Sequence, residues 1–408
     1  MNRRVVIVGG GVAGLEALLA LRDLAGDRAE ATLVAPDPDF VYKPMLVEEP
    51  FDVGPAEQYA LGPLAEEVGV KFVQRAVSRV DADRHAVELD DGSTLDYDFL
   101  VVCAGGRFRP AFDNATTFPS GREPLRINEL LQPAASTRRV AFVVPPGVTW
   151  ALPIYEIALM TQRRALELRL TDVELKVFTP EEAPLAIFGP AASTAVRELL
   201  FARGIEIETD AFVHENDDGE LIATPGDRRV AADAVIALPA MDGPTIPGLP
   251  SDDAGFTPID EHARVPGADD VYAAGDGTTF PVKQGGLGTQ QADAAAAHIA
   301  HRLGAAIAVE PFRPVLRGKL LTGDESLHLR ADVAGGGGEG EARLDALWWP
   351  PQKISGRYLA PWLAHSEAGV DPEPSGRSVD VEVALPHEWH REPMALDPYG
   401  TPPTAEEL

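Results

Sequence analysis

Residues 3–24, RRVVIVGGGVAGLEALLALRDL, constrain the fold more than any other stretch of this chain. A continuous apolar run predicts a buried strand, and Gly9, Gly11 and Gly14 follow it in the pattern G-x-G-x-x-G. The first glycine permits a tight turn, the second lets a pyrophosphate approach the backbone, and the third lets a helix pack close to the strand. Leucines at helical spacing come next, and EATLVAP from residue 30 predicts a second strand. This order of elements predicts a Rossmann-like unit that binds a dinucleotide.

The adenosine ribose is usually held by an acidic residue at the end of the second strand of such a unit. Here that place is occupied by Ala35 and Pro36, and the first carboxylate is Asp37. We therefore expect Asp37 to take this role from slightly further along the chain.

Composition narrows the class of protein. The 408 residues have room for two or three domains, and a hydrophobic fraction of 45% indicates a globular chain. The net charge of −29 argues against nucleic acid or anionic lipid as a general partner. No apolar run approaches the roughly 20 residues that cross a bilayer, and the N-terminus does not resemble a signal peptide. We expect a cytoplasmic protein whose membrane contact is at most peripheral.

A second strand–turn–helix pattern begins at RRVAFVVPPGVTWALPIYEIALM, residues 138–160. Aligned with the glycine pattern, its turn places Pro145, Gly147 and Trp150 at the three glycine positions. Proline offers no N–H group, and an indole fills the space where helix and strand should approach. We therefore predict a duplicated fold with a closed second nucleotide site. A longer loop that still admits NAD(P)H is the alternative.

The segment DDVYAAGDGTTFPVKQGGLGTQQADAAAAHIA, residues 269–300, is the most specific of the chain. Together with the first fingerprint, FVYKPMLVEEP (40–50) and YDFLVVCAGG (97–106), it resembles the two-dinucleotide-domain flavoproteins. Within them it is most similar to the sulfide:quinone oxidoreductase and type II NADH dehydrogenase branch. The resemblance covers about residues 3–320. It implies an α/β fold of two Rossmann-like FAD/NAD(P)-binding units, like that of glutathione reductase, and FAD as the cofactor.

The resemblance also implies roles for individual residues. Val77 would meet the adenine through its backbone, Asp276 the ribityl hydroxyls, and Lys283 the electron-rich edge of the flavin ring. A helix that begins near Gly285 would aim its N-terminus at the same edge, where amide groups and the helix dipole favour negative charge. Lys283 and Gln284 are the predicted catalytic residues. The predicted cofactor-binding residues are Gly9, Gly11, Val12, Ala13, Gly14, Ala35, Asp37, Tyr42, Lys43, Pro44, Val77, Ala104, Gly105, Gly275, Asp276, Lys283, Gly285 and Gly286.

The reacting partners are less constrained. Sulfide:quinone enzymes use paired cysteines, whereas this chain has only Cys103, which we expect to be buried and inert. The sequence therefore predicts an FAD-dependent oxidoreductase that passes electrons from a small-molecule donor to an acceptor such as a quinone, without cysteine-based sulfide chemistry. Gln284, Gln290 and Gln291 are either polar contacts for that acceptor or ordinary helix residues. An NAD(P)H dehydrogenase and a flavin-binding docking module without catalysis are the two alternatives.

The predicted boundaries follow from these patterns. Residues 1–110 and 245–320 form the FAD-binding domain, and 111–244 form the second unit. Residues 321–365 hold a hairpin around Thr322 to Asp324 and an aromatic segment, LWWPPQKISGRYLAPWL, which we expect to cover the flavin or a homodimer interface. Residues 366–408 form an acidic, proline-rich tail that we expect to be extended. No metal site is expected, because neither HEWH (387–390) nor the pair His298 and His301 offers enough ligands.

Overall fold

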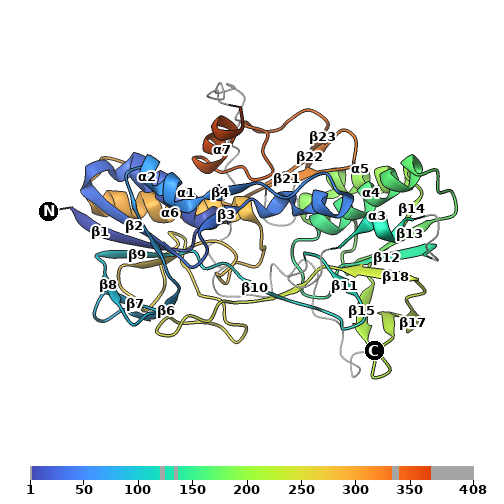
Figure 1. The fold of residues 1–408 in the computed structure, drawn as a ribbon, viewed down its shortest axis with the longest axis horizontal. Coiled ribbons are helices and arrows are strands. Elements are labelled where there is room, and N and C mark those ends of the chain that lie inside the picture. Colours follow the sequence, from blue (N-terminus) through green and yellow to red (C-terminus); the bar gives the residue numbers. More distant parts are fainter. Residues whose placement is uncertain (1, 120–124, 133–136, 333–339, 369–408) are drawn as a thin grey trace.

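Five parallel strands form the first sheet, in the order β20-β9-β1-β2-β5 (Figure 1). The computed structural model describes residues 2–119, 125–132, 137–332 and 340–368. The central strand is buried from Val5 onward, as expected of a parallel strand covered on both faces. The strands are β1 (Arg3–Val8), β2 (Ala29–Ala35), β5 (Lys71–Gln74), β9 (Phe99–Val102) and β20 (Val271–Ala273). The strand order reverses between β1 and β9, which is where ligands bind in open sheets of this kind.

Two long helices pack together on one face of this sheet, α1 (Val12–Ala25) and α6 (Gly285–Arg302). The uncharged alanine run of α6 is explained by this packing. Ala292, Ala295 and Ala296 are fully buried in one core cluster with Leu15 and Leu18 of α1. Because alanine adds so little bulk, the two helix axes can approach closely over the glycine turn.

A second parallel sheet repeats the arrangement, in the order β11-β18-β12-β13-β14. Figure 1 shows the two sheets at opposite ends of the molecule, with β10 between them. The second sheet is covered by α4 (Leu152–Glu167) and α5 (Pro190–Ala202). Its strands are β11 (Thr116–Thr117), β12 (Arg139–Val143), β13 (Glu174–Phe178), β14 (Ile205–Glu208) and β18 (Ala234–Ala237).

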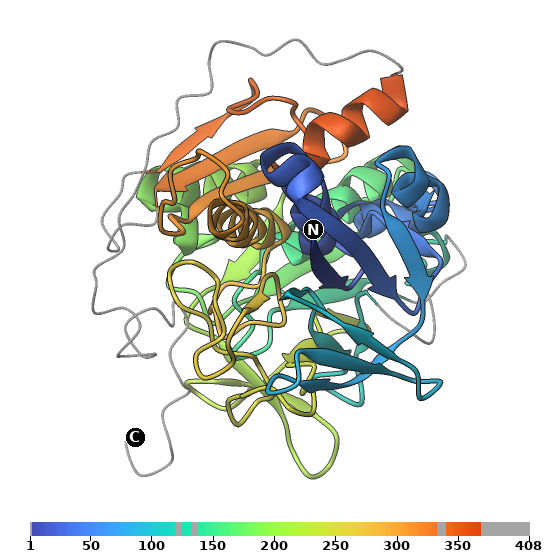
Figure 2. The ribbon, with the colours of Figure 1, turned by 90° about the vertical axis from the view of Figure 1, so that its left-hand side faces the viewer.

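The C-terminal part packs against both units. The predicted hairpin is present as β21 (Val315–Leu320) and β22 (Leu327–Asp332), and β23 (Glu341–Arg343) extends it to three antiparallel strands. β21 packs against α4 of the second unit, whereas the last helix, α7 (Leu359–Ala368), packs against α1 of the first. Figures 1 and 2 show these elements together on one side of the molecule.

Shorter elements complete the two units. The pair β10 (Arg107–Arg109) and β19 (Ala240–Asp242) joins the two segments that connect the units. The helices are α2 (Leu61–Glu67) and α3 (Ile127–Leu130), with 3₁₀ turns at Gly26–Arg28, Lys43–Phe51 and Ala186–Phe188. The strands are β3 (Asp39–Val41), β4 (Gln58–Ala60), β6 (Val77–Asp81), β7 (Ala86–Leu89), β8 (Thr94–Asp96), β15 (Phe212–Glu215), β16 (Leu221–Thr224) and β17 (Arg228–Arg229).

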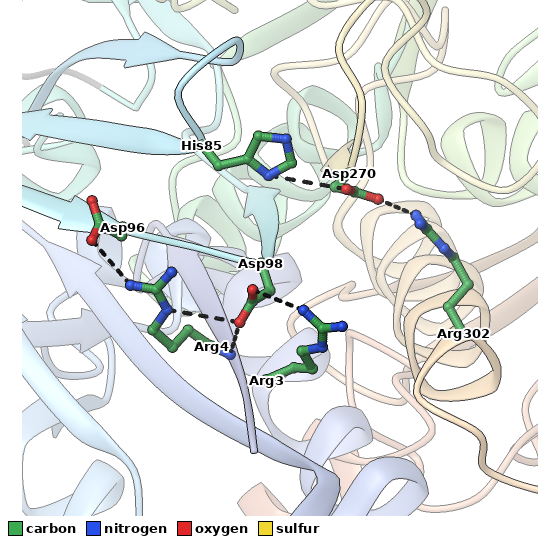
Figure 3. Close-up of polar contacts among 7 residues, drawn as sticks. All are labelled: Arg3, Arg4, His85, Asp96, Asp98, Asp270 and Arg302. Atoms are coloured by element: carbon green, nitrogen blue, oxygen red, sulfur yellow. Dashed lines mark hydrogen bonds and ion pairs between the residues drawn. The ribbon is translucent and has the colours of Figure 1, made fainter. Parts of the chain in front are cut away.

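Charged side chains close the amino-terminal edge of the first sheet (Figure 3). The backbone N–H of Arg4 donates to Asp98 at 2.7 Å, and Arg3 donates to the same carboxylate at 3.2 Å. Asp270, which precedes β20, pairs with Arg302 at the last turn of α6. These surface pairs add little stability individually, but they hold the far end of α6 against the sheet whose other edge carries the site.

The predicted fold class is confirmed: two parallel-sheet units and a C-terminal extension are present. The exact domain boundaries stay predictions. The acidic tail and HEWH lie outside the described residues, apart from residues 366–368, which end α7. In the described part of the chain, no helix is both long and apolar enough to cross a membrane.

Candidate functional site

A cleft of about 1470 Å³ runs from the glycine turn of the first unit to the facing edge of the second. Its volume exceeds the roughly 300–1,000 Å³ typical of a site for one small molecule. Its walls come from both units, from the connecting pair β10 and β19, and from the C-terminal extension. A dinucleotide and a second reactant can therefore occupy it together.

The glycine turn fits the phosphates of a dinucleotide. A Cβ on Gly9 would lie 2.1 Å from the carbonyl oxygen of Cys103, and one on Gly14 would lie 1.8 Å from that of Gly9. These two glycines therefore let the turn and α1 pack against the sheet. Gly11 differs, because its Cβ would meet no protein atom within 4 Å. Gly11 lines the open cleft at the first turn of α1, where a pyrophosphate can reach backbone N–H groups.

The other end of the cleft suits an adenosine. Ala35, Asp37 and Val77 all line it. Val77 begins β6, and the pairing of β6 with β7 shifts register between Val77 and Arg79. This irregularity frees backbone groups at the start of the strand, as the predicted adenine contact requires.

Asp276 and Lys283 both follow the carboxyl end of β20 and are near enough to influence each other electrostatically. Both line the cleft, and among the described residues the Asp276 carboxylate has no hydrogen-bond partner. Burial raises the pKa of Asp276, although the nearby Lys283 partly offsets the effect. Such an unpartnered acceptor in a cleft fits the ribityl hydroxyls of FAD, which would supply the missing donors.

Lys283 is held in a fixed position. Its Nζ donates to the carbonyl of Thr278 at 2.5 Å and lies 3.7 Å from the centre of the Phe256 ring. Burial lowers the pKa of Lys283 to about 8, with Asp276 and Asp252 opposing the shift. The side chain thus carries a positive charge at neutral pH and titrates only slightly above it.

Replacing Lys283 with methionine should make the bound flavin harder to reduce. A positive charge close to the flavin would stabilise the reduced ring by about 2 kcal/mol, which corresponds to roughly 40 mV for a two-electron couple. Because the pKa of Lys283 is about 8, the wild-type protein should lose this contribution as the pH rises above about 8. Spectroelectrochemical titration between pH 6 and 10 measures it. Lys283→Arg should keep the higher potential throughout, and equal potentials for the methionine variant and wild type would contradict the role.

The helix predicted near Gly285 begins there, and Gln284 is its N-cap residue. The Oε1 of Gln284 accepts from the N–H of Leu287 at 2.8 Å and its Nε2 donates to the carbonyl of Arg317 at 3.1 Å. Both ends of the amide are engaged by the backbone, so Gln284 caps α6 and fixes it to β21. Gln290 and Gln291 likewise bond to backbone groups, which favours the structural alternative for all three glutamines.

Three of the predicted cofactor-binding residues, Tyr42, Gly286 and Gly14, do not line the cleft. Tyr42 does not line the cleft, because it is buried and its hydroxyl accepts from the N–H of Ile354 at 3.0 Å. Gly286 also lies away from the cleft, and Gly14 acts through packing alone. The other predicted residues do line it: Gly9, Gly11, Val12, Ala13, Ala35, Asp37, Lys43, Pro44, Val77, Ala104, Gly105, Gly275, Asp276, Lys283, Gln284 and Gly285.

A buried ion pair in the cleft was missed by sequence reasoning. Lys353 from the C-terminal extension lies 2.7 Å from Glu156 of α4, and both side chains are at least nine-tenths buried. The Nζ of Lys353 also donates to the carbonyl of Pro44 at 3.0 Å, and Glu156 accepts from the N–H of Leu321 at 2.8 Å. The only sequence signals were an acid on the apolar face of a helix and a lysine among tryptophans. Neither indicates that the two residues meet.

Cys103 directly follows the strand β9 and lines the cleft. Its thiol is buried, and burial raises its pKa to about 12. A thiol with such a pKa supplies almost no thiolate at neutral pH.

The second unit presents a filled turn to the cleft. Trp150 lines the cleft and packs against Phe188 with ring centroids 5.7 Å apart. Beside it, the hydroxyl of Thr149 donates to the carbonyl of Pro281 at 2.7 Å, which ties this turn to the Lys283 loop.

The acidic residue that follows β13, the second strand of this unit, is Glu181, and its side chain is buried in the protein. Glu181 is fully buried and accepts from Tyr155 at 2.6 Å and Thr179 at 2.8 Å. Burial raises the pKa of Glu181 to about 7. A carboxylate in this position usually faces a nucleotide ribose, whereas Glu181 does not reach the cleft.

No group of three or more metal-binding side chains gathers anywhere in the described residues. His298 instead bonds to the Tyr272 hydroxyl at 2.7 Å and stacks on His262. His301 bonds to a backbone carbonyl.

Residues 1–140 match the model of a protein family described as pyridine nucleotide-disulphide oxidoreductase. Over these residues the chain is similar to that superfamily. The family match and the relatives below indicate FAD as its cofactor.

Individual relatives agree with this assignment. The sulfide-quinone reductase of Aquifex aeolicus is 26% identical over 269 residues, which cover 60% of each chain. A chlorobenzene dioxygenase ferredoxin reductase component of a Cupriavidus species is 28% identical, and the match covers 70% of each. A type II NADH:quinone oxidoreductase of Mycobacterium tuberculosis is 26% identical over 67% of this chain.

Among solved structures, the sulfide:quinone oxidoreductase of Aquifex aeolicus has a TM-score of 0.75. It is 20% identical, and the match covers 91% of this chain and 96% of that one. The likeness shows that the two chains share their fold over most of their length.

Proposed function

We propose that this flavoprotein is an oxidoreductase that transfers electrons from FAD to a quinone-like acceptor. The observation that carries the proposal is the ion pair of Lys353 and Glu156, which lines the cleft and joins the C-terminal extension to the second unit. A quinone takes up two protons with its two electrons, so its site needs a cation that can stabilise an oxyanion and release a proton.

The surroundings of the pair suit such an acceptor. Leu46, Val47, Leu152 and Ile354 line the same cleft, which favours a planar apolar ring. FAD, when bound, supplies a group that takes up electron pairs and releases them singly or together. Lys353 would donate a proton to a carbonyl oxygen of the acceptor. Glu156, whose pKa is raised by burial and lowered again by Lys353, would hold the ammonium in place.

Three features of the second unit support a donor other than NAD(P)H. Proline occupies the first position of its turn, Trp150 fills the third, and Glu181 is turned away from the cleft. We infer that electrons reach FAD from a small donor without a dinucleotide. The single buried thiol also supports a route without paired cysteines.

Two anaerobic experiments on the FAD-loaded protein test the two parts of the proposal. Mixing the dithionite-reduced protein with a water-soluble quinone should restore the absorbance of oxidised flavin, and a flavin that stays reduced would contradict the acceptor. Mixing the oxidised protein with NADH or NADPH should leave the flavin absorbance unchanged over minutes. Rapid bleaching by NADH would instead support the NAD(P)H dehydrogenase, which the ferredoxin reductase and NADH:quinone oxidoreductase relatives make the second candidate.

A further inference from the structure

The segment 353–359 forms one wall of the cleft and is held by a residue outside it. Lys353 and Ile354 line the cleft, and Ile354 lies over the first turn of α6. A Cβ on Gly285 would be 2.7 Å from the Cδ1 of Ile354, so the glycine makes room for this wall. The segment then passes along α1 and leads into α7.

Glu16 of α1 receives the end of this segment. It is fully buried, and its two carboxylate oxygens accept from the N–H groups of Tyr358 at 2.8 Å and Leu359 at 2.7 Å. These are the free amides at the start of α7, so Glu16 caps a helix far away in the sequence. A Cβ on Gly356 would lie 2.4 Å from the same carboxylate, which shows how tightly the segment wraps around it.

A second buried carboxyl group, Asp293 of α6, is coupled electrostatically to Glu16, and its Oδ1 is buried with no hydrogen-bond partner among the described residues. Burial raises the pKa of Asp293 well above its ordinary value of 3.8, and the charge of Glu16 is the second cause. The charged and titratable groups around Asp293 are therefore Glu16 from α1 and Arg357 and Tyr358 from the segment. Burial also raises the pKa of Glu16, but its two amide donors oppose that shift, so we place the proton on Asp293 and the negative charge on Glu16.

We propose that Glu16 is a latch that docks the segment 353–359 onto the FAD-binding unit and thereby positions Lys353 and Ile354 in the cleft. Glu16 does not line the cleft, so it is a positioning residue that acts through the segment. The role in the reaction rests on the proposed function, whereas the docking itself does not.

Hydrogen exchange on the FAD-loaded protein tests the docking directly. In Glu16→Gln the side-chain NH₂ would face an amide N–H, so exchange at Tyr358 and Leu359 should become roughly 10- to 100-fold faster. Asp23→Asn is the matched control, because Asp23 also lies on α1 and accepts from the Tyr358 hydroxyl at 3.2 Å on the surface. We expect the control to exchange like wild type. Unchanged exchange in Glu16→Gln would overturn the latch.

A variant on the segment side covers the case in which Glu16→Gln does not fold. Gly356→Ala places a methyl group against the same carboxylate and leaves α1 untouched. In this variant the amides of the segment should also exchange faster. Iodide should quench the flavin fluorescence more strongly. The two changes should be non-additive, because each removes the same contact. A segment that stays protected in Gly356→Ala would overturn the proposal.

The pH dependence separates a latch from a merely structural contact. The raised pKa of Asp293 means that the folded protein keeps a proton that the unfolded chain releases near pH 4. The stabilisation is complete below that pH and is lost as the pH rises through the pKa of the folded pair. Asp293→Asn should keep the segment protected from exchange, and its free energy of unfolding should no longer fall as the pH rises. Loss of protection in Asp293→Asn, or the same dependence of the unfolding free energy on pH as in wild type, would count against the shared proton.

Discussion

Replacing Lys353 with methionine is expected to lower the rate of acceptor reduction by about 10²- to 10⁴-fold, the usual effect of removing a proton donor. It should also destabilise the protein by about 3–5 kcal/mol, because Glu156 would be left buried without its counter-charge. Stopped-flow reoxidation of the reduced flavin by a soluble quinone measures the first effect. Urea unfolding measures the second.

Two further variants separate chemistry from stability. The double variant Lys353→Met with Glu156→Gln removes both charges, so it should recover much of the stability while the rate stays low. Lys319→Met is the matched control, because Lys319 lines the same cleft and donates to the carbonyl of Pro351 at 3.2 Å. Fast reoxidation in Lys353→Met would remove the residue from the proposed reaction.

The glycines of the fingerprint should respond to alanine in two different ways. In Gly14→Ala the new methyl group would overlap the carbonyl oxygen of Gly9, so α1 must move away from the sheet. The gain of about 1 kcal/mol in helix propensity cannot offset that clash, and we expect a protein that fails to fold or to bind FAD. In Gly11→Ala the methyl group meets no protein atom, so the apoprotein should be as stable as wild type.

The Gly11 variant should nevertheless lose FAD. Its methyl group points into the cleft where a pyrophosphate must approach the backbone, which should weaken FAD binding by about 10- to 100-fold. Thermal unfolding of the apoprotein and fluorescence titration with FAD distinguish the two variants. Normal FAD affinity in a stable Gly11→Ala protein would mean that the cofactor does not approach this turn.

The sequence predicted much of the site because local patterns encode it. The turn after β1, the strand β9 before Cys103 and the start of α6 are each read within a few residues, since glycine spacing and helix capping are short-range properties. Gln284 shows the limit of this reasoning. A glutamine is equally suited to a catalytic contact and to a helix cap. Only the two backbone groups that bond to Gln284 favour the cap.

The sequence by itself therefore determined a two-unit dinucleotide-binding fold, a helix that begins at Gly285 and a turn in the second unit that lacks two of its three glycines. Only the tertiary structure decided that Lys353 meets Glu156 and that Glu16 caps α7. These residues are 197 and about 340 positions apart, respectively. Contacts over such separations leave no local pattern, because a lysine or glutamate shows its partner only when folding removes both from water. The same burial makes the two contacts matter, since a charge taken out of water needs a compensating group beside it.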